Sequence, residues 1–220
     1  MSNLEFYEKT HEYYLNNKRV PSVTQILNPI SNEIYRNVEK GVLEHKASIG
    51  TITHKCIEEY TLYGLPADFI TTNERALDYF DGYLKFREDY KEQFVKTLYA
   101  EFQGSYTKDN ISFAGTIDNI SLFKDGITLI DYKTVEVPNE PLIALQLYGY
   151  KLIAEQVLNL PIKHFKALQF KKGGNYELID LTNLVNDLQT KKLFEYFYEF
   201  TQLMKDYGIE NQAKLLEERI

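Results

Sequence analysis

Three runs of strand-forming residues follow one another in the middle of the chain, at residues 96–106, 111–123 and 127–134. The short segments Lys108-Asp-Asn110 and Lys124-Asp-Gly126 separate these runs. Asp, Asn and Gly at such positions favour tight reversals of the chain. The sequence therefore predicts an antiparallel meander of three strands, and the rest of the fold must be built around it.

Helical patterns flank the meander on both sides. Before it, residues 73–93 carry an apolar stripe at helical spacing, which is formed by Leu77, Phe80, Tyr83 and Leu84. After it, residues 140–158 are expected to form a helix that begins near Pro141. A second strand pair is expected next, with strands at 163–171 and 175–181 around Gly173-Gly174. A helix over about 183–206 and a short charged helical tail follow it.

The N-terminal part is predicted to begin with strands and to continue mostly as helix. Residues 4–20 have the pattern of a small hairpin that turns at Asn16-Asn17. Ser22 is a natural N-cap for a short helix over residues 23–27. Residues 32–63 are expected to be mostly helical.

These elements predict an α/β fold in one domain. The chain has 220 residues, and its hydrophobic fraction of 44% is ample for a core. We divide it into an N-terminal hairpin and helical elaboration (1–93), a sheet core (94–181) and C-terminal helices (182–220).

Composition excludes several classes of site. The single cysteine, Cys56, rules out an internal disulfide framework and any four-cysteine zinc or iron–sulfur site. No apolar run is long enough to span a bilayer, so no membrane partner is expected. The acidic N-terminus resembles neither a signal peptide nor a transit peptide, which favours an intracellular protein. The net charge of −7 does not exclude nucleic acid, because cations bound to carboxylates recover part of the attraction to phosphate.

The meander carries a set of charged residues that favours metal chemistry. Asp131 and Lys133 are two positions apart in one strand and therefore project to the same face. An adjacent antiparallel strand brings Asp118 beside them. Carboxylates that hold a hard divalent cation, with a lysine next to a developing anion, are what phosphodiester cleavage requires. The alternatives are a strand-end acid at Asp118 and a structural ion pair between Asp131 and Lys133.

Four further residues are candidates for the same site. His54 lies one turn after Gly50 on a predicted helix, and imidazole is an acceptable ligand for Mn²⁺. His11, His45 and His164 are expected to be surface or core histidines. Glu101 is either a further carboxylate near the metal or a solvent-facing partner of a lysine on the next strand. Gln146 and Tyr150 share a helix face, either as packing residues or as donors to phosphate that help to orient Lys133.

Taken together, Gly50-x3-His54, Glu101, Gly115-x-x-Asp118, Asp131-x-Lys133 and Gln146-x3-Tyr150 resemble the RecB-type branch of the PD-(D/E)XK nucleases. All five elements occur in the order of that family, across about 100 residues. The segment Lys18-Arg-Val-Pro21-Ser-Val-Thr-Gln-Ile-Leu27 also resembles small phage exonucleases and the mitochondrial genome maintenance exonuclease.

The resemblance implies a restriction-endonuclease-like αβββαβ core with a mixed sheet flanked by helices. It implies one or two Mg²⁺ or Mn²⁺ ions; the ligands would be His54, Asp118, Asp131 and the backbone carbonyl of Tyr132, with Glu101 at a possible second metal. Lys133 would position or activate the attacking water, and Glu101 would support that water. Gln146 and Tyr150 would contact the substrate phosphate. With one cysteine, the iron–sulfur cluster of several relatives is not expected.

The function expected from this resemblance is a metal-dependent DNA exonuclease in recombination, repair or replication. It would act on DNA ends, with a preference for single strands, in the cytoplasm of a bacterial or phage-infected cell. A recombination or replication protein is a possible partner, and the oligomeric state stays open. The alternatives are a non-catalytic DNA-end-binding or recombination-partner protein and a restriction-type endonuclease. A strip of Lys163, Lys166, Lys171 and Lys172 either follows the DNA backbone or is a solvated face.

Overall fold

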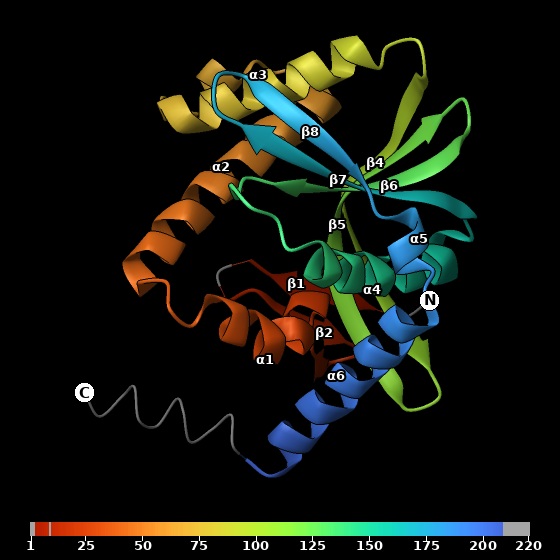
Figure 1. Ribbon diagram of the computed structural model, residues 1–220. Coiled ribbons are helices and arrows are strands. Elements are labelled where there is room, and N and C mark those ends of the chain that lie inside the picture. The colour runs from red at the N-terminus through yellow and green to blue at the C-terminus, as the bar shows by residue number, and fades with distance from the viewer. Residues whose placement is uncertain (1–2, 9, 209–220) are drawn as a thin grey trace.

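The computed structural model describes residues 3–8 and 10–208, and its centre is a mixed sheet of five strands. The strands lie side by side in chain order, as Figure 1 shows: β4 (Phe94–Lys108), β5 (Ile111–Phe123), β6 (Gly126–Lys133), β7 (Ile162–Lys171) and β8 (Asn175–Asp180). Neighbouring strands are antiparallel except β6 and β7, which are parallel. The predicted meander, β4–β5–β6, and the predicted strand pair, β7–β8, are confirmed.

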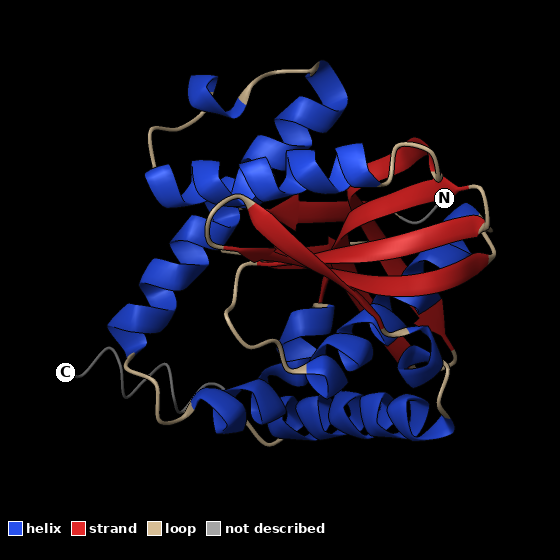
Figure 2. Cartoon of the chain, turned by 45° about the horizontal axis from the view of Figure 1, so that its top comes forward, coloured by secondary structure: helices blue, strands red, loops and turns tan. Residues whose placement is uncertain are grey.

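Helices cover both faces of this sheet (Figure 2). They are α1 (Val23–Tyr35), α2 (Lys40–Tyr63), the 3-10 helix η1 (Ala67–Phe69), α3 (Glu74–Asp89), α4 (Glu140–Leu158), α5 (Thr182–Val185) and α6 (Leu188–Asp206). The helix α4 supplies the crossover that a parallel strand pair needs, between β6 and β7. None of the helices in the described residues is both long and apolar enough to cross a membrane.

Two hydrophobic cores lie on opposite faces of the sheet. One core is formed by α1, α4 and α6 with the inner face of the strands, and it includes the fully buried Phe113 and Phe165. The other lies under α2 and α3, where Phe80 and Tyr83 of the predicted stripe pack against Phe170 of β7. The predicted α/β architecture follows from this arrangement, since each sheet face buries its apolar side chains under helices.

A second, smaller sheet is formed by β1 (Leu4–Tyr7), β2 (Glu12–Leu15) and β3 (Lys18–Val20). The predicted hairpin is therefore three-stranded, and its predicted turn is present, with φ of 50° at Asn16 and 64° at Asn17. The backbone N–H of Ala114 on β5 donates to the carbonyl of Pro21, 3.0 Å away. The small sheet is thus tied to the far end of the β4–β5 hairpin.

Several helix boundaries differ from those predicted. The helix α1 continues past Leu27 to Tyr35 although Pro29 lies inside it, because Ile30 packs against the core beyond the proline. The helix α3 ends at Asp89, four residues before the predicted end. The predicted C-terminal helix is split, since Asp187 accepts a hydrogen bond from the N–H of Gln189 at 2.6 Å and begins α6. The predicted charged tail lies outside the described residues.

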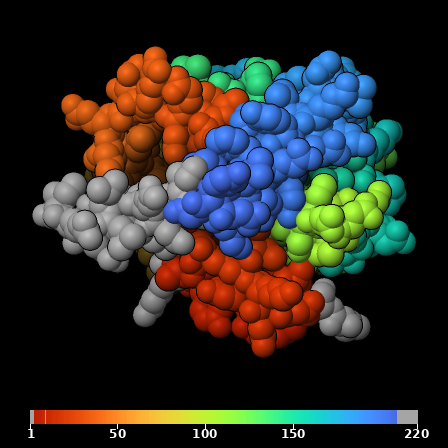
Figure 3. Space-filling view, turned by 90° about the horizontal axis from the view of Figure 1, so that it is seen from below, coloured from red at the N-terminus to blue at the C-terminus, as the bar shows by residue number. Residues whose placement is uncertain are grey.

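The helix α6 closes the lower side of the molecule, where it meets α1 and the β4–β5 turn (Figure 3). Its Tyr198 hydroxyl accepts a hydrogen bond from the N–H of Ser112, 2.8 Å away, next to that turn. The C-terminal helices therefore support the core from the side opposite to α2 and α3.

Candidate active site

The site begins where the β5–β6 ladder ends. The last pair of that ladder is Asn119 with Ile130, so the register places Asp118 opposite Asp131. The Oδ2 atom of Asp118 instead accepts a hydrogen bond from the N–H of Tyr132, at 2.7 Å. Because the N–H and C=O of a strand residue point to the same neighbour, the carbonyl of Tyr132 also faces this gap.

Glu101 marks an irregularity in β4 at the same level of the sheet. Ala100 pairs with Asn119 and Phe102 with Ile117, so Glu101 lies across from Asp118. Its φ of 47° is in the left-handed region, where a residue with a side chain rarely lies within a strand. Such strain is found most often at functional sites, and it occurs here at the candidate carboxylate.

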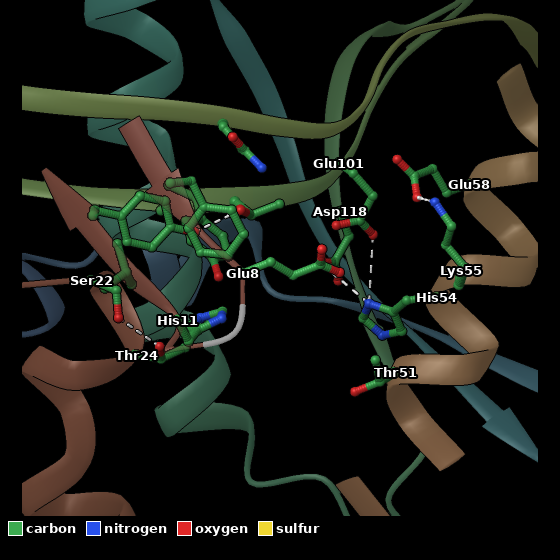
Figure 4. A pocket seen from close by; sticks show the side chains of 17 residues that line it. Glu8, His11, Ser22, Thr24, Thr51, His54, Lys55, Glu58, Glu101 and Asp118 are labelled. Carbon is green, nitrogen blue, oxygen red and sulfur yellow. Dashed lines mark hydrogen bonds and ion pairs between the residues drawn. The ribbon is translucent and has the colours of Figure 1, made fainter. Parts of the chain in front are cut away.

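His54 on α2 completes a group of three possible metal ligands. Its Nδ1 atom is 3.6 Å from Oδ1 of Asp118 and 3.7 Å from Oε1 of Glu101, and Figure 4 shows the imidazole and the two carboxylates converging. One ligand atom from each of the three residues lies within 4.8 Å of the others. The helix α2 lies close to the sheet near this site, because a Cβ on Gly50 would be 3.2 Å from Oγ1 of Thr134.

A chain of side-chain contacts runs from β6 to α4 beside this group. Asp131 is 1% exposed, and its Oδ2 atom is 2.6 Å from Nζ of Lys133. The ammonium donates to Oε1 of Gln146 at 3.1 Å, and Nε2 of Gln146 donates to the hydroxyl of Tyr150 at 3.0 Å. Gln146 and Tyr150 share a helix face as predicted, and Gln146 orients Lys133.

Gly115 allows this chain of contacts to reach the site. A Cβ at this position would lie 2.9 Å from Cε1 of Tyr150, which is closer than real Cβ contacts come. The glycine in β5 therefore leaves room for the tyrosine ring over the sheet.

The donor set fits a hard divalent cation. In the described part of the chain, Oε1 of Glu101 and Oδ1 of Asp131 are buried without a hydrogen bond. The other carboxylate oxygen of Asp131, Oδ2, has the ammonium of Lys133 as its partner at 2.6 Å. Buried carboxylate oxygens without donors are costly, and a cation satisfies them. Oxygen ligands with one imidazole suit Mg²⁺ or Mn²⁺.

The structure brings some predicted ligands together and separates others. His54, Glu101 and Asp118 form the convergent group, and the N–H of Tyr132 donates to Asp118 within it. The role of the Tyr132 carbonyl as a ligand stays a prediction. Asp131 is not part of that group in the described residues, because its carboxylate is directed to Lys133. Its role as a metal ligand stays a prediction, whereas its place beside Lys133 is confirmed.

Burial and neighbouring charges shift the pKa of several groups at the site. Burial lowers the pKa of His54, but the carboxylates of Asp118 and Glu101 outweigh this and raise it to about 9. Burial raises the pKa of Asp131 to about 6, although Lys133 opposes the shift. Burial lowers the pKa of Lys133, yet Asp131 and Asp118 raise it above its ordinary value. Burial also raises the pKa of Tyr150, so its hydroxyl stays neutral.

A cleft of about 720 Å³ opens in front of the convergent group. His54, Glu101, Asp118 and Tyr150 line it, whereas Asp131 and Lys133 are not among the residues at its surface. In Figure 4, residues of the small sheet and the start of α1 lie across the cleft from α2. The cleft is therefore walled by segments from the first sixty residues and from the sheet core.

Sequence reasoning missed the contribution of the small sheet to this cleft. Phe6, Glu8, His11 and Tyr13 line it, although His11 is predicted to be an ordinary surface or core histidine. The Tyr13 hydroxyl is 2.7 Å from Oγ1 of Thr116, two residues before Asp118. No motif marks these residues, because the side on which the small sheet packs is set by tertiary contacts.

Three lysines of the predicted strip lie next to oxygen atoms of neighbouring residues. Lys171 pairs with Glu177, Nζ of Lys172 is 3.5 Å from Glu136, and Lys163 donates to the carbonyl of Asp125 at 2.7 Å. Three of the four lysines thus have oxygen partners, and the choice between the two alternatives stays a prediction.

Comparison with known proteins gives little further information. No family model matches the chain, and no curated protein matches it. Among solved structures, the crystal structure of SSO0001 is 12% identical and has a TM-score of 0.38, over 71% of this chain and 74% of that chain. The function of this chain must therefore be inferred from its own residues.

Proposed function

We propose that this chain is a metal-dependent deoxyribonuclease that hydrolyses phosphodiester bonds from DNA ends. The observation that supports this most is the convergence of His54, Glu101 and Asp118 within 4.8 Å, beside the buried pair of Asp131 and Lys133. Metal-binding carboxylates next to a fixed ammonium supply what phosphoryl transfer needs, namely positioning and charge stabilisation.

The order of the elements supports the finer fold proposed with this function. The helix α3 is followed by the β4–β5–β6 meander, the crossover helix α4 and the parallel strand β7. This order supports the proposed restriction-endonuclease-like αβββαβ core. Under this proposal, the candidate residues would be those that a PD-(D/E)XK nuclease of the RecB type carries on these elements.

Each residue has a defined task in the proposed reaction. A bound Mg²⁺ or Mn²⁺ would polarise the scissile phosphate and lower the pKa of the attacking water. Lys133 is held by Gln146 and does not itself line the cleft, but its side chain is 21% exposed. There it would stabilise the negative charge that grows on the phosphate and orient the water. Tyr150 remains neutral, so its hydroxyl can donate to a phosphate oxygen. His54 must release its proton before its Nδ1 can act as a ligand.

The walled cleft supports an action on single-stranded ends. The small sheet and α2 flank the convergent group, so an unpaired strand has a path to it between two walls. The cleft also separates the proposal from a restriction-type endonuclease, which must place a continuous duplex across its site.

Digestion of three labelled substrates in Mg²⁺ tests this function. We expect products from an end-labelled single strand, fewer from a linear duplex, none from a closed single-stranded circle and none with EDTA. Asp131→Asn should lose the activity, and Asp109→Asn, which changes an exposed aspartate with φ of 53° in the β4–β5 turn, should keep it. Cleavage of the circle would indicate an endonuclease, and binding without products would indicate a non-catalytic DNA-end-binding protein.

A further inference from the structure

Two aromatic side chains stand on the side of the cleft opposite the metal-ligand group. Phe6 of β1 and His11 of the turn before β2 both line the cleft that also contains His54, Glu101 and Asp118. Figure 4 shows the imidazole of His11 across the cleft from that of His54. A ligand bound at the metal-ligand group would therefore extend toward Phe6 and His11.

The position of Phe6 is fixed by a buried anchor. Phe6 and Tyr13 are paired in the β1–β2 register, and their rings stack with centroids 4.6 Å apart. Tyr13 is 1% exposed, and its hydroxyl is 2.7 Å from Oγ1 of Thr116 on β5. The ring of Phe6 is thus held in place relative to the strand that carries Asp118.

His11 meets Phe6 at a right angle. The ring centroids are 5.3 Å apart and the ring planes are 89° apart, so the two rings form a corner. His11 is exposed and has φ of 51°, and in the described residues its imidazole has no hydrogen bond or ion pair. Because His11 is exposed and lines the cleft, its ring nitrogens are accessible to a ligand that enters there.

We propose that Phe6 and His11 bind the terminal unpaired nucleobase of a DNA strand whose phosphate lies at the metal-ligand group. This inference rests on the proposed function, and it adds the part of the substrate that the opposite wall contacts. A flat base stacks on an aromatic ring whatever its sequence, and the imidazole can bond its edge. In a duplex, the edge of the base is already paired.

The charge of this wall favours a base over a second phosphate. Glu8 lines the cleft next to Phe6 and His11, whereas Glu58 on the α2 wall is paired with Lys55 at 2.8 Å. The carboxylate of Glu8 repels an anion that is not neutralised by a cation, but it does not repel a neutral base. The wall is therefore suited to the uncharged part of a nucleotide.

The test compares two single-stranded oligonucleotides that differ only at their ends. One carries ordinary terminal nucleotides, and the other carries stable abasic sites there. Dissociation constants are measured in Mg²⁺ in a Lys133→Ala background, and kcat/KM is measured with an intact Lys133. We expect His11→Ala and Phe6→Leu to reduce the preference for the base-bearing strand by about tenfold, which is typical of one lost aromatic–base stack.

Matched controls come from the other face of the same two strands. Tyr7 and Tyr14 pack edge to face with ring centroids 5.3 Å apart, and neither lines the cleft. Because side chains alternate along a strand, Tyr7→Ala and Tyr14→Ala disturb the small sheet without changing the cleft wall. Both controls should retain the full preference for the base-bearing strand.

The outcomes separate this inference from the proposed function. One outcome is that DNA is cleaved while His11→Ala and Phe6→Leu keep the same preference for the base-bearing strand over the abasic strand as the unsubstituted chain. That result would overturn the proposed contact with the base. If the unsubstituted chain cleaves no substrate, the proposed hydrolysis is wrong, and the dissociation constants of the two strands still decide the base contact. Equal binding of both strands by the unsubstituted chain would also overturn it.

Discussion

At the scale of single residues, Lys133 and Asp131 form a tightly held pair of opposite charges. Both are largely withdrawn from water, and the ammonium is fixed between a carboxylate and Gln146. Burying two charges is costly, and such a pair is often no more stabilising than apolar residues of similar size. The position of this pair in a central strand therefore supports the proposed chemical role more than a role in stability.

Lys133→Ala should reduce kcat by about 10²–10³, the typical loss when one preorganised donor to a transition state is removed. The fold should survive, because the pKa of Asp131 is already about 6 and the carboxyl group can take up a proton when its partner is lost. Single-turnover kinetics and thermal unfolding check this, with Lys85→Ala as the control, since Lys85 is exposed and bonds only Asn175 among the described residues. An unchanged kcat would exclude the proposed role of Lys133.

His54 should make metal binding depend on pH. Its pKa of about 9 means that a cation competes with a proton for the imidazole over the physiological range. The apparent Kd for Mn²⁺ should fall about tenfold per pH unit between pH 7 and 8.5, and calorimetry at three pH values measures this. His54→Ala should bind more weakly and with little pH dependence, because the pKa of Asp131 lies lower, at about 6.

The same pKa predicts the opposite trend for stability without metal. His54 has a folded pKa of about 9, above its ordinary value of 6.5, so its stabilising charge is fully present below pH 6.5. That contribution is lost as the pH rises through 9. Urea unfolding in EDTA should show this loss, and His54→Ala should lack it. A metal affinity that did not change with pH would contradict both expectations.

At the scale of elements, the regular backbone of β4 is interrupted at one residue, and the sequence does not predict this. Most of this strand pairs regularly with β5, but at Glu101 the backbone takes a φ of 47°. In a regular strand, the side chains of Ala100, Glu101 and Phe102 would point to alternate faces of the sheet, and none of the three residues would have a strained backbone. The unusual φ thus occurs at the residue whose carboxylate lies 3.7 Å from Nδ1 of His54 in the metal-ligand group.

Glycine should be more stabilising than alanine at position 101, which reverses the usual order in a strand. A residue with a Cβ pays about 1–2 kcal/mol in the left-handed region, and glycine does not. We expect Glu101→Gly to unfold with a free energy about 1 kcal/mol higher than Glu101→Ala, measured in urea. At Gln103, which pairs regularly with Thr116, the alanine variant should be the more stable by about 0.5–1 kcal/mol.

The comparison of glycine with alanine isolates the backbone term, because both variants lose the carboxylate. A higher stability of alanine at both positions would mean that the φ at residue 101 is not strained. The control at Gln103 has the same strand and the same neighbour, so a general effect of glycine on β4 would appear there too.

The elements that local patterns determine were predictable, and those that tertiary contacts determine were not. Asp118, Asp131 and Lys133 could be placed together because strand alternation and two short turns fix their relation. The left-handed backbone at Glu101 could not be predicted, since glutamate has no preference for it. The length of α1 was underestimated because Pro29 is a local signal that packing of Ile30 overrides.

At the scale of the whole molecule, the cleft joins segments that are far apart in the sequence. Its walls include Phe6 at one end of the chain and Tyr150 on α4. The bonds that hold the small sheet in place, from Tyr13 to Thr116 and from Ala114 to Pro21, are single contacts over about a hundred residues. Sequence spacing does not predict contacts over such separations. The predicted site therefore contained the metal-ligand group but not the opposite wall of the cleft, which the small sheet forms.

Because the site gathers carboxylates in a chain of net charge −7, a divalent cation should stabilise the whole fold. Ligand that binds only the folded state adds about 2.7 kcal/mol at a concentration of 100 times Kd. For a domain of this size, each kcal/mol raises Tm by about 2–4 °C, so saturating Mn²⁺ should raise Tm by about 5–10 °C. Thermal unfolding in Mn²⁺ and in EDTA measures the shift without any substrate.

Two glutamates of the same cleft provide the test of where that cation binds. Glu101 belongs to the convergent group, whereas Glu58 lines the cleft but pairs with Lys55 at 2.8 Å. Glu101→Gln should lose most of the Mn²⁺-dependent rise in Tm, because the glutamine oxygen is a weaker, uncharged ligand. Glu58→Gln should keep it. An equal rise in Tm for both variants would place the cation elsewhere, and the stabilisation would then be a general effect of charge screening on an acidic protein.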